Sequence, residues 1–153
     1  MTWKRGRNRV NELLASGHLD HIHGSAANGT ALLTSSSRLL ESAEREADIN
    51  PEAAYALAYD SARKACSALL AQQGLRTRSA GHHLTTEEVV RAQFGGPFDA
   101  FGALRRRRSE IEYPRHPGED VSTTEVWEAI ANARAIHSAA ESLIDQLSNY
   151  HSR

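Results

Sequence analysis

Apolar residues recur at steps of three and four positions along most of this sequence, and this spacing constrains the fold more than any other feature. It is clearest between Thr30 and Ala47 and again between Val126 and Leu147. Residues spaced in this way share one face of an α-helix. Strand signals are scarce, because β-branched residues are few and no alternation of polar and apolar residues persists over five or more positions. The sequence therefore predicts an all-α fold.

Capping residues and glycines divide this pattern into separate helices. Asn50 followed by Pro51 is a typical helix start, and Thr85 and Ser122 each begin a sequence that matches a capping box. The predicted helices are a short one that contains Val10, Leu13 and Leu14 and ends at Gly17, then Thr30 to about Ala47, Pro51 to about Gln73, a short one from Thr85 to Phe94, Pro97 to Tyr113, and Ser122 to Leu147. The four main helices predict an antiparallel bundle over residues 30–150, preceded by a short helix and loop over residues 1–29.

The composition bounds the class of protein. With 153 residues the chain fits one domain with a core of its own. The formal net charge of −1 argues against a general nucleic-acid coat but leaves a local basic site open. Cys66 is the only cysteine, so neither a disulfide framework nor a thiolate zinc cluster is expected. No apolar run approaches the ~20 residues of a membrane span, and no signal peptide is recognisable, so we expect a cytoplasmic protein without a membrane partner.

The segment RRRRSEIEY, residues 105–113, is the most distinctive short stretch. On a helix that begins at Pro97, Arg108 lies on or beside the apolar face, while Arg106 and Arg107 point outward. Glu112 lies one turn beyond Arg108, close enough to form an ion pair. The run as a whole is typical of a solvated helix face. Arg108 with Glu112 and the following tyrosine is a more specific combination, and both an interface role and a functional role stay open for it.

A second polar group lies in the alanine-rich helix that begins at Pro51. Tyr59 and Arg63 are one turn apart, as are Asp60 and Lys64. One interpretation is a polar patch that faces a site. The simpler one is ordinary surface pairing, worth roughly 0.2–0.5 kcal/mol per pair.

The histidines raise the question of a metal site. Three of them lie with Asp20 within residues 18–23, and imidazoles with a carboxylate are suitable ligands for zinc or nickel. We interpret this stretch as a polar loop without a fixed scaffold, and residues 81–83 (GHH) in the same way. His137 falls on the apolar face of the last helix and is interpreted as a core histidine. We predict no metal ligand and no cofactor.

The order of these features resembles the HEPN domain family. The matching segments, in chain order, are residues 59–65 (YDSARKA), 73–76 (QGLR), 81–83 (GHH), a short helix, and 105–113 (RRRRSEIEY). The likeness covers residues 30–147 and is to the small single-domain HEPN proteins of actinobacteria. It implies an all-α bundle that dimerises, with the arginine motifs of two subunits meeting in a cleft. Many members are metal-independent ribonucleases of toxin–antitoxin or phage-defence systems; others bind nucleotides or partner a nucleotidyltransferase.

The resemblance also assigns roles to single residues. Arg108 matches the motif arginine, which can hold the scissile phosphate, and Ser109 matches its polar neighbour. Four residues separate Arg108 from Tyr113, which stands where an active member has a histidine that moves protons. A tyrosine hydroxyl is a poor general base at neutral pH, and the nearest histidine, His116, lies outside the pattern. The remaining residues expected to bind RNA or nucleotide are Arg105, Glu112, Tyr59, Arg63 and Lys64.

We therefore predict a HEPN-like homodimer that binds RNA or a nucleotide through a degenerate Arg-x4-Tyr motif. One alternative is an active ribonuclease toxin in which Arg108, Ser109, Tyr113 and His116 are catalytic. Another is a non-catalytic helical module that binds a partner protein, such as a nucleotidyltransferase. The missing histidine favours binding over cleavage.

Overall fold

The computed structural model describes residues 3–78 and 82–151 of the chain. The helices within these residues are α1 (Arg7–Ala15), α2 (Thr30–Glu46), α3 (Pro51–Gln72), α4 (His82–Gln93), α5 (Phe101–Glu112) and α6 (Thr123–Ile144), with the short 3₁₀ helices η1 (Gly24–Ala26) and η2 (Gly96–Ala100). Two strands, β1 (Leu19–His21) and β2 (Leu75–Thr77), form a small antiparallel sheet. The prediction of a mostly helical fold is confirmed, and the sheet is an addition that the sequence did not predict.

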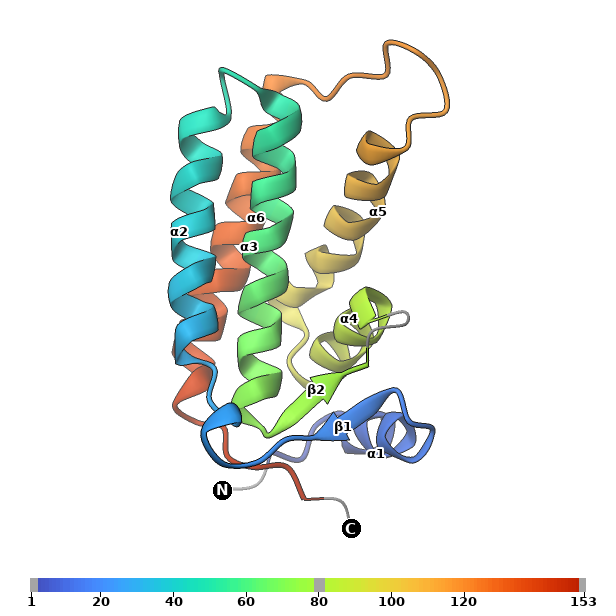
Figure 1. Cartoon of the computed structure of the whole chain (residues 1–153), viewed down its shortest axis with the longest axis vertical. Helices are drawn as coiled ribbons and strands as arrows, with labels where there is room; N and C mark the ends of the chain where they lie inside the picture. The colour runs from blue at the N-terminus through green and yellow to red at the C-terminus, as the bar shows by residue number, and fades with distance from the viewer. Residues whose placement is uncertain (1–2, 79–81, 152–153) are drawn as a thin grey trace.

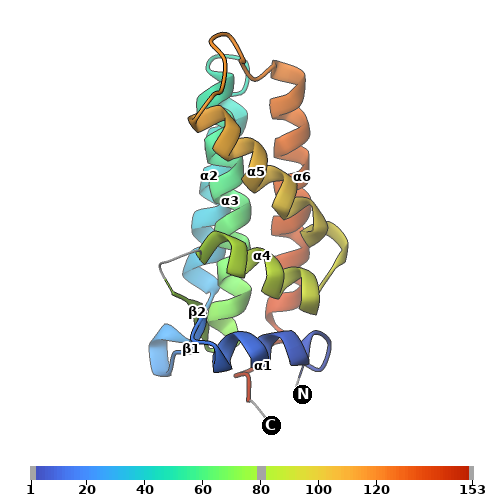
Figure 2. The same cartoon turned by 90° about the vertical axis from the view of Figure 1, so that its right-hand side faces the viewer.

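The four long helices form the body of the molecule. α2, α3 and α6 lie side by side, and α5 leans across α3 and α6 (Figures 1 and 2). These four helices run alternately up and down along the chain, as the predicted bundle requires (Figure 1). α3 is the central element, because it packs against α2, α4, α5 and α6. The end that carries the α2–α3 turn and the 113–122 loop is called the upper end; α1 and the sheet lie at the lower end.

One strand of the sheet comes from residues 18–23, which we predicted as a polar loop. Residues 18–23 are therefore not a loop without a scaffold. Leu19 and Leu75 are each only 1% exposed, and the Ile22 N–H extends the pairing by donating to the Gly74 carbonyl at 2.8 Å. Each strand is only three residues long and contributes one fully buried leucine. Strands this short carry too little alternation to be recognised in the sequence.

Small side chains make α3 the centre of the bundle. Its face toward the core is fully buried and includes Ala54, Ala58, Ala62, Ala65 and Leu69. Such side chains let neighbouring helices approach closely. The approach is closest at the start of α2, where a Cβ on Gly29 would lie 2.0 Å from the carbonyl oxygen of Ala68. Glycine at position 29 is thus a condition for the contact between α2 and α3.

The predicted helix starts at Thr30, Asn50 and Ser122 are confirmed, and the one at Thr85 is wrong. The side chains of Asn50 and Ser122 each accept a hydrogen bond from a backbone N–H of the first turn, at 3.2 and 3.1 Å. Thr30 is the first residue of α2, and the preceding glycine takes the cap position. Thr85 does not start α4, because the helix begins at His82 and Thr85 is buried within it.

A hydrogen-bonded polar cluster joins α2, α3 and α6 inside the bundle. Ser36 Oγ donates to the Ser61 carbonyl oxygen at 2.8 Å, and Ser61 Oγ donates to the Ser36 carbonyl oxygen at 2.8 Å. His137 Nδ1 lies 2.9 Å from Ser36 Oγ, and its Nε2 lies 2.5 Å from a carboxylate oxygen of Glu141. His137 is therefore the core histidine that the sequence predicted.

The N-terminal segment packs onto the lower end of the bundle. A second, smaller core there contains Val10, Leu13, Leu19, Leu70, Leu75, Val89 and Tyr150. The side-chain amides of Gln73 and Gln93 bond each other in both directions, at 2.6 and 3.0 Å. Trp3 Nε1 donates to the carbonyl of Gln93, and the Tyr150 N–H donates to that of Gln73. The segments near both ends of the chain are thus held by the same pair of glutamines.

Candidate anion site along helix α5

The arginine run is a network of ion pairs rather than a free basic patch. The pairs in the described residues are Arg91–Glu87, Arg91–Asp99, Arg105–Glu87, Arg106–Glu87, Arg107–Glu110, Arg107–Glu125 and Arg108–Glu112. Five guanidinium groups and five carboxylates take part, so the formal charges of this network balance. A balanced network has little long-range attraction for the many phosphates of a nucleic acid. An anion site in this network therefore depends on a single arginine rather than on the charge of the whole network.

Glu87 of α4 is the buried centre of this network. Its side chain is only 5% exposed, and its Oε2 lies 2.9 Å from Arg105 Nε. Arg91 and Arg106 approach the other carboxylate oxygen at 3.5 and 3.9 Å. A Cβ on Gly102 would lie 2.1 Å from Glu87 Oε1, so the missing side chain at Gly102 makes room for the carboxylate. The local sequence around Glu87 matches a capping box and gives no sign of this burial. The glycine inside the arginine helix is the available signal of a close approach.

Arg107 corrects one prediction. We expected it to point outward with Arg106, but its side chain is 26% exposed against 61% for Arg106. Its guanidinium donates to both carboxylate oxygens of Glu125, in the first turn of α6. This hydrogen bond also raises the pKa of the Arg107 guanidinium. Arg107 thus ties α5 to α6.

In the described residues, Arg108 forms its ion pair within its own helix. The predicted ion pair is confirmed, because Arg108 Nη1 lies 2.7 Å from Glu112 Oε2, and the side chains are 27% and 48% exposed. Partly exposed pairs one helical turn apart contribute only about 0.3–0.5 kcal/mol. Arg105, by contrast, is held by the buried Glu87. Arg108 can therefore change partners at low cost. Arg106 is held more weakly still, since its contact with Glu87 is 3.9 Å long and its side chain is 61% exposed.

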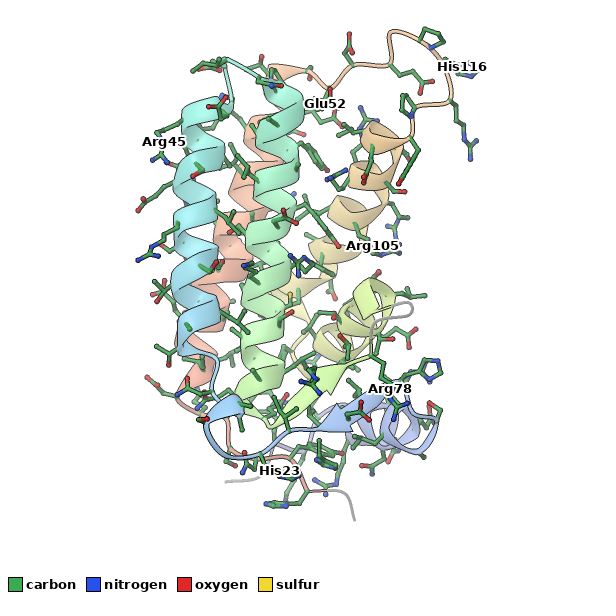
Figure 3. The ribbon with its side chains drawn as sticks, in the orientation of Figure 1. His23, Arg45, Glu52, Arg78, Arg105 and His116 are labelled. Atoms are coloured by element: carbon green, nitrogen blue, oxygen red, sulfur yellow. The ribbon has the colours of Figure 1, made fainter. Side chains whose placement is uncertain are left out.

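Arg108 also lines a hollow between α3 and α5. This hollow has a volume of about 390 Å³ and is lined by Asn50, Glu52, Ala53, Ala56, Arg108, Ile111 and Glu112. A second hollow of about 620 Å³ shares four of these residues and extends under the 113–122 loop. Together they form one groove at the upper end of the bundle, here called the α3–α5 groove. Glu52 marks the upper end of α3 in Figure 3, and Arg105 lies farther down α5.

The motif residues after Arg108 do not gather around it. Tyr113 ends α5 and is 72% exposed, and Ser109 is exposed on the same helix. His116 lines the larger hollow and lies on the outer turn of the loop, beyond the end of α5 (Figure 3). In the described residues no hydrogen bond or ion pair joins Arg108 to Tyr113 or His116. The geometry therefore provides no imidazole beside Arg108.

Of the three α3 residues expected to bind the ligand, Tyr59 lies at the α3–α5 contact. Tyr59 is 3% exposed and stacks on Phe101, with 5.7 Å between ring centres. Arg63 pairs with Asp60 at 3.6 Å. Lys64 donates to Ser35 Oγ on α2 at 3.1 Å, so it belongs to the α2–α3 contact and is separated from the arginine helix.

Two buried tyrosines of α3 make stability depend on pH in the alkaline range. Burial raises the pKa of both Tyr55 and Tyr59 to about 12. Between pH 10 and 12 the folded protein therefore keeps protons that the unfolded chain has lost, so stability must fall as pH rises through this window. We expect Tyr55→Phe to reduce this fall in the free energy of unfolding, measured by urea titration at pH 9 to 12. An unchanged pH dependence in Tyr55→Phe would contradict the assignment.

The histidine segment does not assemble a metal site. Asp20 accepts hydrogen bonds from Arg78 at 3.0–3.2 Å, and His18 Nδ1 lies 2.7 Å from Ser16 Oγ. The rings of His21 and His23 stack on each other, 6.2 Å apart. Over residues 3–78 and 84–151, no group of three or more histidine, cysteine or acidic side chains is placed to hold a metal ion. Gly81 of the second histidine segment lies outside the described residues, as do the side chains of His82 and His83.

Comparison with known proteins gives no further guide. No family model, curated protein or solved structure matches this chain. Among the described helices, none combines the length and apolar character needed to cross a bilayer.

Proposed function

We propose that this chain is a HEPN-like module that binds a nucleotide or a short RNA segment in the α3–α5 groove without cleaving it. The observation that carries the proposal is the position of Arg108, which lines the groove and is held only by the exposed Glu112. A phosphate offers the guanidinium two charge-assisted hydrogen bonds, which are stronger than an exposed pair within one helix. Arg108 thus supplies one phosphate contact at low cost.

The carboxylates of the groove favour a nucleotide over a bare polyphosphate. Glu52 and Glu112 line the same hollow as Arg108. Carboxylate oxygens repel additional phosphates, but they accept hydrogen bonds from base amino groups and ribose hydroxyls. A ligand with one phosphate near Arg108 and hydrogen-bond donors near the two glutamates fits this charge pattern.

The arrangement of the motif supports binding rather than cleavage. Tyr113 takes the place that the HEPN motif gives to the catalytic histidine. A tyrosine hydroxyl is a poor general base at neutral pH. His116, the nearest imidazole, lies on the outer turn of the loop. A general base must come within hydrogen-bond reach of the proton that it removes. The active-ribonuclease alternative therefore requires a rearrangement of the 113–122 loop.

Exposed apolar side chains at the upper end support a protein partner as part of the same proposal. Ile49 in the α2–α3 turn is 77% exposed, Tyr113 is 72% exposed, and Trp127 near the start of α6 is 40% exposed. Large apolar side chains of this kind are enriched at protein interfaces. We propose a homodimer through this end, in a cytoplasmic toxin–antitoxin or defence setting in which a nucleotidyltransferase is a second candidate partner. Light scattering of the purified protein tests the dimer, and a monomeric mass at micromolar concentration would count against it.

Cleavage is tested directly with RNA. We expect purified protein to leave single-stranded RNA intact in the presence of EDTA, and a bacterial host to grow equally well when it expresses the wild type or Arg108→Ala. The variant, prepared in parallel, controls for contaminating nuclease. Metal-independent cleavage by the wild type that is lost in Arg108→Ala would show instead that the protein is a ribonuclease.

A further inference from the structure

A separate hollow lies at the lower end of the molecule, between α2, α3 and β2. It has a volume of about 240 Å³ and is lined by Ile22, Ala26, Asn28, Leu32, Ser67, Leu70, Ala71, Leu75, Arg76 and Thr77. Leu70 and Leu75 are almost fully buried and Ile22 and Leu32 partly so. Half or more of the lining residues are apolar, and the polar ones carry hydrogen-bond donors. No acidic side chain lines this hollow, in contrast to the α3–α5 groove.

Arg76 gives the hollow its only formal charge. Its partner across the sheet is Asp20, the residue that would ordinarily pair with it. The Asp20 carboxylate is already occupied, because Arg78 donates three hydrogen bonds to it at 3.0–3.2 Å. The Arg76 side chain has no hydrogen bond or ion pair in the part of the chain that the structure describes. A guanidinium without a partner thus stands beside an apolar hollow.

We propose that this hollow binds a small monocarboxylate with an apolar body, whose carboxylate pairs with Arg76. The volume equals about eight waters of ~30 Å³ each, which is the size of a short-chain fatty acid or a simple aromatic acid. The apolar body replaces water against Leu70 and Leu75, and the carboxylate accepts a two-pronged hydrogen bond from the guanidinium. Sites of this kind combine an apolar lining with a few polar groups that fix orientation. The inference does not depend on the nucleotide proposal, which concerns different residues.

Three probes of equal length separate the contributions of charge and hydrocarbon. Hexanoate, hexan-1-ol and hexylamine are titrated against the full chain, and binding is followed by calorimetry and by two-dimensional NMR. We expect hexanoate to bind with a Kd on the order of 0.1–1 mM, hexanol more weakly, and hexylamine most weakly. Hexanoate that binds no tighter than hexylamine would overturn the proposal.

Substitutions test whether Arg76 and Ser67 take part in binding hexanoate. Arg76→Gln is expected to weaken hexanoate about tenfold or more and to leave hexanol unchanged, since only the ion pair is lost. Ser67→Leu, which fills the hollow from α3, is expected to weaken both. Arg45→Gln removes the same charge at the far end of α2 (Figure 3) and is the matched control. Hexanoate affinity that survives both Arg76→Gln and Ser67→Leu, or that falls equally in Arg45→Gln, would show that the site lies elsewhere.

Discussion

Gly102→Ala is expected to lower the free energy of unfolding by roughly 2–4 kcal/mol, although alanine is the better helix former. The new Cβ would lie 2.1 Å from Glu87 Oε1 and 2.7 Å from its Cδ. Glu87 would have to leave a position in which its side chain is only 5% exposed and give up its 2.9 Å contact with Arg105. Breaking a buried ion pair in this way leaves a buried charge without a partner and is strongly destabilising.

Making Gly102→Ala in a Glu87→Ala protein shows whether Glu87 causes this loss of stability. In a Glu87→Ala protein the carboxylate is absent, so Gly102→Ala is expected to cost nothing or to stabilise by about 1 kcal/mol through helix propensity. Glu88→Ala is the matched control background, because the neighbouring Glu88 is 33% exposed and pairs with Arg9 instead. Urea denaturation of the single and double variants measures these differences. An equal loss in the wild-type and Glu87→Ala backgrounds would contradict this account.

The bundle could be predicted because its determinants are local. The spacing of apolar residues and the caps at Asn50 and Ser122 depend only on neighbours in the chain, and both are found as expected. The two strands could not be predicted in this way, since Leu19 pairs with Thr77 across almost sixty intervening residues. Thr85 shows the limit of a local motif, because burial of α4 overrides the capping pattern.

The same distinction applies to the candidate site. The Arg108–Glu112 pair was predictable from a spacing of four on one helix. The Arg105–Glu87 pair joins two helices, and nothing local in the sequence connects its members. The prediction that Arg107 points outward was wrong because its partner, Glu125, lies on another helix, α6. Charge pairs between elements emerge only once the elements are packed.

Loss of Arg108 is expected to have the largest effect on binding. Arg108 is the member of the arginine run that lines the α3–α5 groove, and its pair with Glu112 is a partly exposed pair within one helix. A hydrogen bond between charged groups contributes about 1.5–3 kcal/mol, so Arg108→Ala should weaken a phosphate ligand roughly 10- to 100-fold. Arg106→Ala removes the same charge two residues away, from a side chain that is 61% exposed and outside the hollow. It is therefore the matched control.

The most direct measurement of the central proposal is the equilibrium binding of a fluorescein-labelled RNA hexanucleotide to the wild type, Arg108→Ala and Arg106→Ala, with adenosine monophosphate as competitor. Fluorescence anisotropy at a fixed salt concentration gives the three dissociation constants. The account predicts that the wild type binds, that the mononucleotide competes, that Arg108→Ala binds at least about tenfold more weakly, and that Arg106→Ala stays within about twofold of the wild type. Equal affinities for the two variants, or no binding by the wild type at millimolar mononucleotide or micromolar RNA, would contradict it.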